Sequence, residues 1–157
     1  YVFGAYGWLM TTTFFVLGLA AFAVAAGLRD VHQSSRSARI GFGLLAVGGL
    51  GVCLAGVFED FIPHAAASAV AFPSLILAAL LLSWSFRQAP GWRRIYPATL
   101  LMALGMLAAL SSMIAQVGMP GLQQRIFLGL VLVWLSVIAD RLVRVTASDR
   151  RAVTSHE

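Results

Sequence analysis

The residues best suited to chemistry lie in one short polar segment between two apolar runs. Glu59, Asp60 and His64 fall within this segment. Two carboxylates and an imidazole at this spacing could bind a divalent cation, or a carboxylate could orient the imidazole for acid–base catalysis. Alternatively, the segment is a solvated turn in which Asp60 stabilises the N-terminus of the next helix. The residues alone leave both interpretations open.

A metal site made of Glu59, Asp60 and His64 would suit an intramembrane hydrolase, but the ligand set is unusual. Catalytic zinc usually has three protein ligands, with histidine prominent among them. His64 is the only histidine predicted on its side of the membrane, since His32 is predicted on the opposite side. Cys53 stands alone in an apolar stretch, so no disulfide or thiolate cluster is expected within the chain. The residues identify no cofactor.

Further polar residues are predicted at the same membrane depth as Asp60 and His64. Together they could line an outward-facing cavity, in which Arg125 pairs with a carboxylate or holds a phosphate or carboxylate of a ligand. In the alternative interpretation, the hydroxyls bond carbonyls of their own helices and the other groups face water. The residues concerned are Thr11, Thr12, Thr13, Ser68, Ser111, Ser112, Gln116, Gln123, Gln124 and Arg125.

The elements that must position these side chains are predicted to be transmembrane helices. Hydrophobic residues make up 60% of the 157-residue chain and charged residues only 11%, which is typical of a membrane protein. About twenty apolar residues in a helix cross the roughly 30 Å hydrocarbon core. Five such stretches predict an all-α bundle over residues 1–145. Their bounds are Trp8 to Leu28, Ile40 to Phe58, Ala65 to Phe86, Tyr96 to Ala115, and Ile126 to Val143.

The distribution of arginine predicts the orientation of the bundle. All eleven basic residues are arginines, and ten of them lie in the first or third connection or from the end of the fifth span onwards. The positive-inside rule places these on the cytoplasmic side of a bacterial inner membrane, with Tyr1 outside and the C-terminus inside. Short arginine clusters between apolar runs are typical of membrane topology, so no nucleic-acid partner is expected.

The two ends of the chain also carry expectations. Because the sequence begins at Tyr1, an upstream helix is expected in the intact protein, which would then have six spans. Residues 146–157 lack apolar periodicity and are predicted to form a polar cytoplasmic tail that is disordered or lies on the membrane surface. Membrane lipids are expected partners of its arginines.

Glycine is concentrated in the second span, and this predicts close helix packing. Small residues let helix backbones approach each other in lipid. The second span is therefore expected either to be central in the bundle or to meet a membrane-protein partner. The glycines concerned are Gly41, Gly43, Gly48, Gly49, Gly51 and Gly56.

Short motifs across the chain resemble the bacterial membrane family known as domain of unknown function 998. They are Gly56-Val57-Phe58 with Asp60 and then His64-Ala65-Ala66-Ala67; Trp92-Arg93; and Gly121-Leu122 with Gln124-Arg125 leading to Trp134. The resemblance implies six or more spans and no established activity. It also implies that Asp60, His64 and Arg125 belong to one cluster.

These observations leave three functions open. The leading interpretation is a membrane protein that binds a lipid head group or small polar ligand at Asp60, His64 and Arg125. The second is a metal-dependent lipid hydrolase that uses Glu59, Asp60 and His64. The third is a structural or accessory subunit that packs its glycine-rich second span against another membrane protein.

Overall fold

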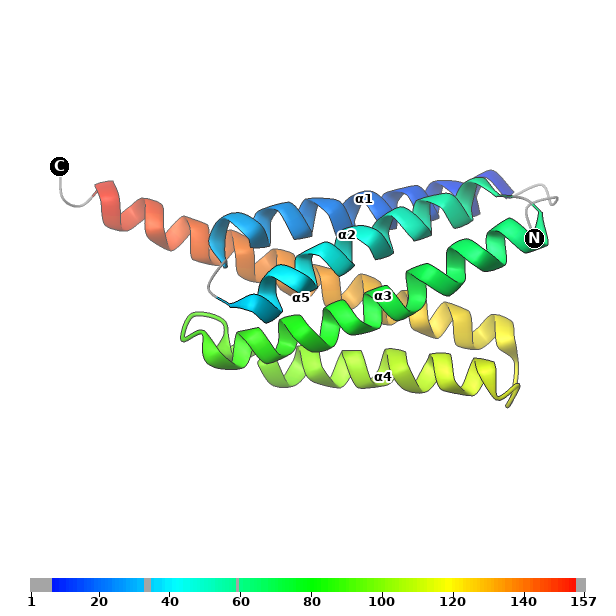
Figure 1. Ribbon diagram of the computed structural model, residues 1–157. Helices are drawn as coiled ribbons and strands as arrows, with labels where there is room; N and C mark the ends of the chain where they lie inside the picture. Colours follow the sequence, from blue (N-terminus) through cyan, green and yellow to red (C-terminus); the bar gives the residue numbers. More distant parts are fainter. Residues whose placement is uncertain (1–6, 33–34, 59, 155–157) are drawn as a thin grey trace.

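The computed structural model describes residues 7–32, 35–58 and 60–154, and all regular structure in these ranges is helical (Figure 1). Five of the helices in these ranges are long and apolar enough to cross a membrane. The predicted all-α membrane bundle is therefore confirmed. The elements are α1 (Gly7–Val31), α2 (Arg36–Val57), α3 (Phe61–Gln88), the 3₁₀ turn η1 (Arg93–Ile95), α4 (Tyr96–Ile114) and α5 (Pro120–Thr154).

The helices α1, α2, α3 and α5 extend beyond the apolar stretches that predict them. Polar residues at a membrane boundary can continue a helix, so hydropathy marks the membrane crossing rather than the helix end. The largest difference is in α5, which continues to Thr154 although its span was predicted to end at Val143. Residues 146–154 are thus helical, which the expectation of a disordered tail did not anticipate. No glycine or proline follows Gly129 to stop the helix.

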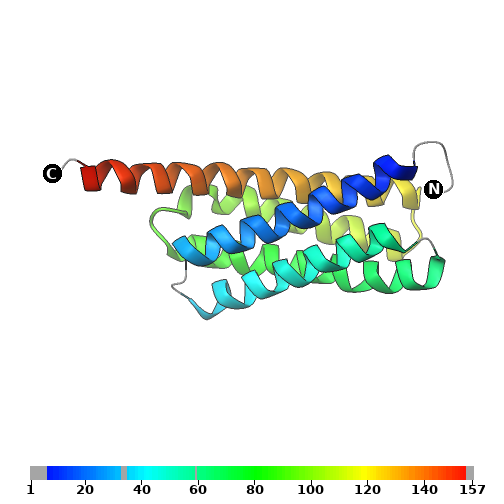
Figure 2. The same ribbon diagram turned by 90° about the horizontal axis from the view of Figure 1, so that it is seen from above.

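The helices form a closed ring in which each packs against its sequence neighbour and α5 returns to α1. Successive helices run in opposite directions (Figures 1 and 2). One end of the bundle therefore holds the α1–α2 and α3–α4 connections and the C-terminal part of α5. We call it the arginine-rich end, because ten of the eleven arginines belong to these three segments or adjoin them in the sequence. The opposite end holds the α2–α3 and α4–α5 connections.

The glycines of α2 contact helices of the same chain on two faces. A Cβ built on Gly51 would lie 2.9 Å from Ala71 Cβ and 3.1 Å from the Ala67 carbonyl oxygen of α3. On the other face, a Cβ on Gly49 would lie 3.0 Å from the carbonyl oxygen of Gly18 in α1. Gly41, Gly48 and Gly56 are covered in the same way, so a partner helix could not reach these faces. Gly43 alone of the six has open space around it.

Aromatic side chains of α5 fill the centre of the ring. Trp134 is fully buried, and the rings of Phe127 and Phe72 pack with their centroids 4.6 Å apart. This contact joins α5 to α3 across the bundle. The mid-span position of Trp134, far from the boundaries that tryptophan usually prefers, is thus explained by burial in the protein core.

A buried histidine closes the arginine-rich end of the core. His32 follows α1 directly and packs against the stacked rings of Phe86 and Trp92, with both centroids 5.5 Å from its own. The Ser85 hydroxyl donates to the Leu82 carbonyl oxygen, so its oxygen accepts from His32 Nε2–H at 3.0 Å. Burial lowers the pKa of His32 below its ordinary value, because the charged form loses hydration.

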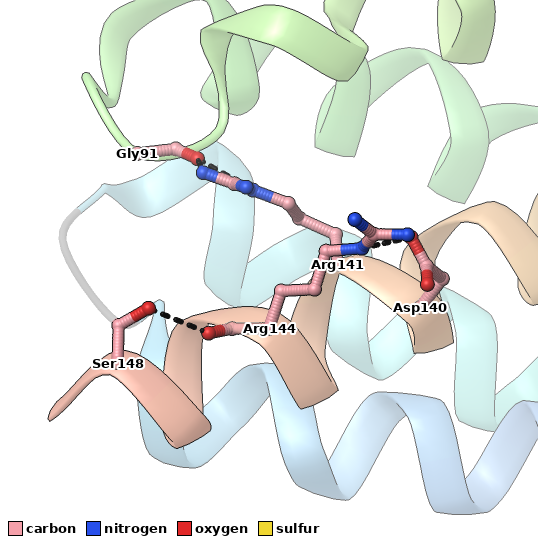
Figure 3. A network of polar contacts seen from close by, with 5 residues as sticks. All are labelled: Gly91, Asp140, Arg141, Arg144 and Ser148. Carbon is pink, nitrogen blue, oxygen red and sulfur yellow. Dashed lines mark hydrogen bonds and ion pairs between the residues drawn. The ribbon is translucent and has the colours of Figure 1, made fainter. Parts of the chain in front are cut away.

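Arg141 of α5 holds the same end together from outside the core (Figure 3). The guanidinium of Arg141 donates to the Gly91 carbonyl oxygen, with Nε at 2.7 Å, and so ties α5 to the α3–α4 connection. One turn later, Arg144 Nε lies 2.8 Å from Asp140 Oδ2, and both side chains are exposed. Such an exposed pair within one helix contributes little to stability.

Replacement of Gly51 by alanine is expected to destabilise the bundle. The new methyl group would meet backbone atoms of α3, which cannot move without displacing the helix, and such overpacking costs about 1–3 kcal/mol. Thermal unfolding of the detergent-purified protein measures the effect as a lower Tm. Gly129→Ala is the matched control, because the space around this exposed helical glycine is open. Equal Tm values for the two variants would contradict the packing described here.

Stability is expected to fall as the pH drops below about 6.5, the ordinary pKa of histidine. The unfolded chain then binds a proton at His32 that the folded chain, with its lowered pKa, does not bind. The measurement is Tm in detergent between about pH 7.5 and 5 for wild type, His32→Gln and the control His64→Gln. The His32→Gln variant should have the flattest dependence of the three. A pH dependence unchanged by His32→Gln would contradict this role.

Candidate functional site

A small polar cavity lies at the end of the bundle opposite the arginine-rich end. It has a volume of about 110 Å³, and side chains of α1, α2, α3 and α5 line it. Most of its wall is apolar, and its polar side chains come from four residues. The lining residues are Met10, Thr11, Phe14, Ala55, Gly56, His64, Gly121, Gln124, Arg125 and Leu128.

The imidazole of His64 is held in one orientation. Its Nδ1 lies 2.8 Å from the Ala55 carbonyl oxygen; a carbonyl can only accept, so Nδ1 carries the proton and donates. Ala55 lies in the last turn of α2, where carbonyls lack partners within the helix. The Phe14 ring packs edge-on against the imidazole, with centroids 6.3 Å apart. In the part of the chain that the structure describes, no hydrogen bond reaches Nε2, which can accept a proton or a hydrogen bond.

The α4–α5 connection positions the other polar groups of the cavity. Gly118 has a φ of 87° and Gln116 a φ of 54°, so the chain turns sharply through left-handed backbone before α5 begins. The Gln123 side chain donates to the Val117 carbonyl oxygen and fixes this turn to the first residues of α5. Gln124 and Arg125 follow directly and line the cavity.

The structure brings together only part of the predicted cluster. His64, Gln124, Arg125 and Thr11 all line the cavity. Asp60 does not: it is exposed at the start of α3 and its side chain caps no backbone N–H. Among the described residues, Arg125 forms no ion pair with Asp60. The His64 imidazole is oriented by a backbone carbonyl in the place where the sequence suggested a carboxylate.

Several hydroxyl and amide groups predicted for the cavity lie elsewhere. Ser112 donates to the Ala109 carbonyl oxygen of its own helix, and Gln116 is exposed in the turn. Thr12 and Thr13 likewise bond carbonyls one turn earlier in α1. For these hydroxyls the alternative interpretation, bonding within the helix, is the one observed.

The predicted metal site has no support from the described residues. No group of three histidine, cysteine, aspartate or glutamate side chains within them is arranged to hold a metal ion. Glu59, one of the three predicted ligands, lies outside the described residues. A metal-dependent hydrolase therefore stays a prediction.

Two glycines that sequence reasoning did not place in the site shape the cavity. A Cβ on Gly56 would lie 2.7 Å from Phe14 Cβ, so the missing side chain lets α1 approach α2. Nothing lies within 4 Å of a Cβ on Gly121, so this glycine leaves its side of the cavity open. The sequence does contain a signal for their role in the site, because each glycine lies close to a predicted site residue. Gly56 is eight residues before His64, and Gly121 is four residues before Arg125.

Residues 1–140 match the model of the family described as protein of unknown function, DUF998, and the chain belongs to this family. No curated protein and no solved structure matches it. Two of the motifs that carried the sequence resemblance meet at the cavity, through Gly56 and His64 on one side and Gly121, Gln124 and Arg125 on the other. Trp92 and Trp134 instead belong to the core.

Proposed function

We propose that this DUF998 protein binds a small anionic group, the phosphate or carboxylate of a lipid head group or polar solute, in the cavity of His64, Gln124 and Arg125. The observation that supports the proposal most is the convergence of these three side chains from α3 and α5 on one largely apolar cavity. Charged side chains near lipid are costly unless solvated or paired. Among the described residues, Arg125 has no carboxylate partner, and a bound anion would supply one.

The donors around the cavity suit an oxyanion. A guanidinium presents several N–H groups in a planar fork that matches phosphate or carboxylate oxygens. Gln124 adds an amide, and the cavity lies at the N-terminal end of α5, where the helix dipole favours negative charge. His64 Nε2 can accept from a ligand hydroxyl, or donate once protonated.

The size of the cavity restricts what can enter it. Its volume of about 110 Å³ is far below that of a site for a drug-sized ligand, which is roughly 300–1,000 Å³. A phosphate or carboxylate fits, whereas a whole sugar or nucleotide does not. A head group would therefore enter with its anionic part only.

The orientation of the bundle would place this cavity on the outer face of a bacterial inner membrane. Arginines near the connections are retained in the cytoplasm, which puts the opposite end outside. The chain would then sample anions or lipid head groups of the outer leaflet, and its C-terminus would lie in the cytoplasm.

Fusions at the C-terminus test this orientation in a bacterial host. Green fluorescent protein fused after Glu157 should fluoresce, since it folds in the cytoplasm, and alkaline phosphatase fused there should be inactive. An active phosphatase fusion would place the C-terminus outside and reverse the proposed orientation.

Arg125→Gln is expected to weaken anion binding at the cavity about tenfold or more, because charge-assisted hydrogen bonds contribute about 1.5–3 kcal/mol. Binding is measured by equilibrium dialysis of the detergent-purified protein with radiolabelled inorganic phosphate and, separately, with short-chain phosphatidic acid. The two probes distinguish a soluble anion from a lipid head group. Arg93→Gln, an exposed arginine at the other end, is the matched control.

Gly121→Leu provides a second variant that keeps every charge. Its side chain would enter open space and fill the cavity, so binding should be lost while Tm is retained. The proposal is wrong if wild type binds neither probe, or if both Arg125→Gln and Gly121→Leu bind as wild type does.

A further inference from the structure

A second opening lies near the arginine-rich end, on the side of the bundle formed by α1 and α2. It is a groove of about 560 Å³ between the two helices. Its size falls within the range of small-molecule sites, which is about 300–1,000 Å³. It shares no lining residue with the His64 cavity.

Small residues create this groove. The backbones of α1 and α2 are in contact at Gly18 and Gly49, which leaves no space between the two helices at this point. Towards the arginine-rich end, the facing positions carry Ala26 and Gly43, and a Cβ on Gly43 would meet nothing within 4 Å. The helices remain neighbours but leave the space between them unfilled.

The groove has a cationic mouth and an apolar body. Arg29, near the end of α1, and Arg39, near the start of α2, both line it and both are exposed. Over the described ranges, neither guanidinium forms an ion pair or a side-chain hydrogen bond. Phe22 lies two turns before Arg29, so apolar lining extends about 10 Å from the charges towards the middle of the membrane.

This arrangement matches the two chemical parts of a phospholipid. A phosphate between Arg29 and Arg39 would neutralise two guanidinium groups that line the same groove. An acyl chain could follow Phe22 and Ala26 along the groove. Basic pockets between transmembrane helices bind anionic head groups for the same reason. An apolar partner helix would fill the body of the groove but would leave the two charges at its mouth uncompensated.

We infer that the groove between α1 and α2 is a binding site for an anionic phospholipid, with its phosphate held by Arg29 and Arg39 and one acyl chain lying along Phe22 and Gly43. The site is separate from the proposed anion cavity, because it lies towards the other end of the bundle. It differs from general attraction of arginines to a charged surface, because it requires these two arginines and an open groove.

Native mass spectrometry of the full chain tests the inference, with phosphatidylglycerol as the probe and phosphatidylcholine as the neutral comparison. Wild type should retain one phosphatidylglycerol in preference to phosphatidylcholine. Arg29→Gln with Arg39→Gln should weaken this binding about tenfold or more. The matched control is Arg93→Gln with Arg94→Gln, which removes the same charge from exposed arginines at the same end.

Gly43→Leu distinguishes the contribution of the groove to lipid binding from that of the arginine charges, which it leaves unchanged. Its side chain would fill open space without displacing a neighbour, so the protein should keep its Tm and lose the lipid bound in this groove. Equal losses in the two double-arginine variants would show general surface attraction and overturn the inference. So would a phosphatidylglycerol occupancy in Gly43→Leu equal to that of wild type, equal retention of phosphatidylcholine, or a co-purifying protein chain that Gly43→Leu displaces while no lipid is bound.

Discussion

The contact between helix backbones at glycine is the interaction on which the rest of this bundle depends. In lipid, apolar side chains gain little by leaving the solvent, so helices must associate through close packing. Gly49 and Gly51 lie on different faces of α2, and each lets a neighbouring helix approach to van der Waals contact. The α2 helix is thereby fixed between α1 and α3. The larger side chains of α4 and α5 then complete the ring around this tightly packed part.

The same packing decides where polar chemistry can occur. The middle of the bundle is filled by apolar side chains such as Trp134 and Leu75, and charged groups lie towards the helix ends. Each of the two described histidines is bonded near a helix terminus, His64 to a carbonyl of α2 and His32 to the hydroxyl of Ser85. Both imidazoles therefore serve the packing of helices, and only His64 also faces a cavity.

The fold was largely predictable because hydropathy is a property of whole segments. Apolar runs located the five long helices of the described chain, and the positions of arginine distinguished the two ends. The candidate site was predictable only in part, because membrane depth can be read from the chain whereas rotation about a helix axis cannot. Ser112 and Arg125 were placed at a similar depth, yet Ser112 bonds its own helix and Arg125 lines the cavity. The carbonyl of Ala55 that orients His64 could not be predicted either, because every residue type has a backbone carbonyl.

The length of α5 has a mechanical consequence. Arg141 fastens this helix to the α3–α4 connection, and the helix then continues past the ends of its neighbours (Figure 2). At 1.5 Å per residue, Thr154 lies about 20 Å further along the axis than Arg141. A helix anchored in this way is a rigid spacer rather than a flexible tether. Anything attached at its far end would be kept at a set distance from the bundle and would turn with it.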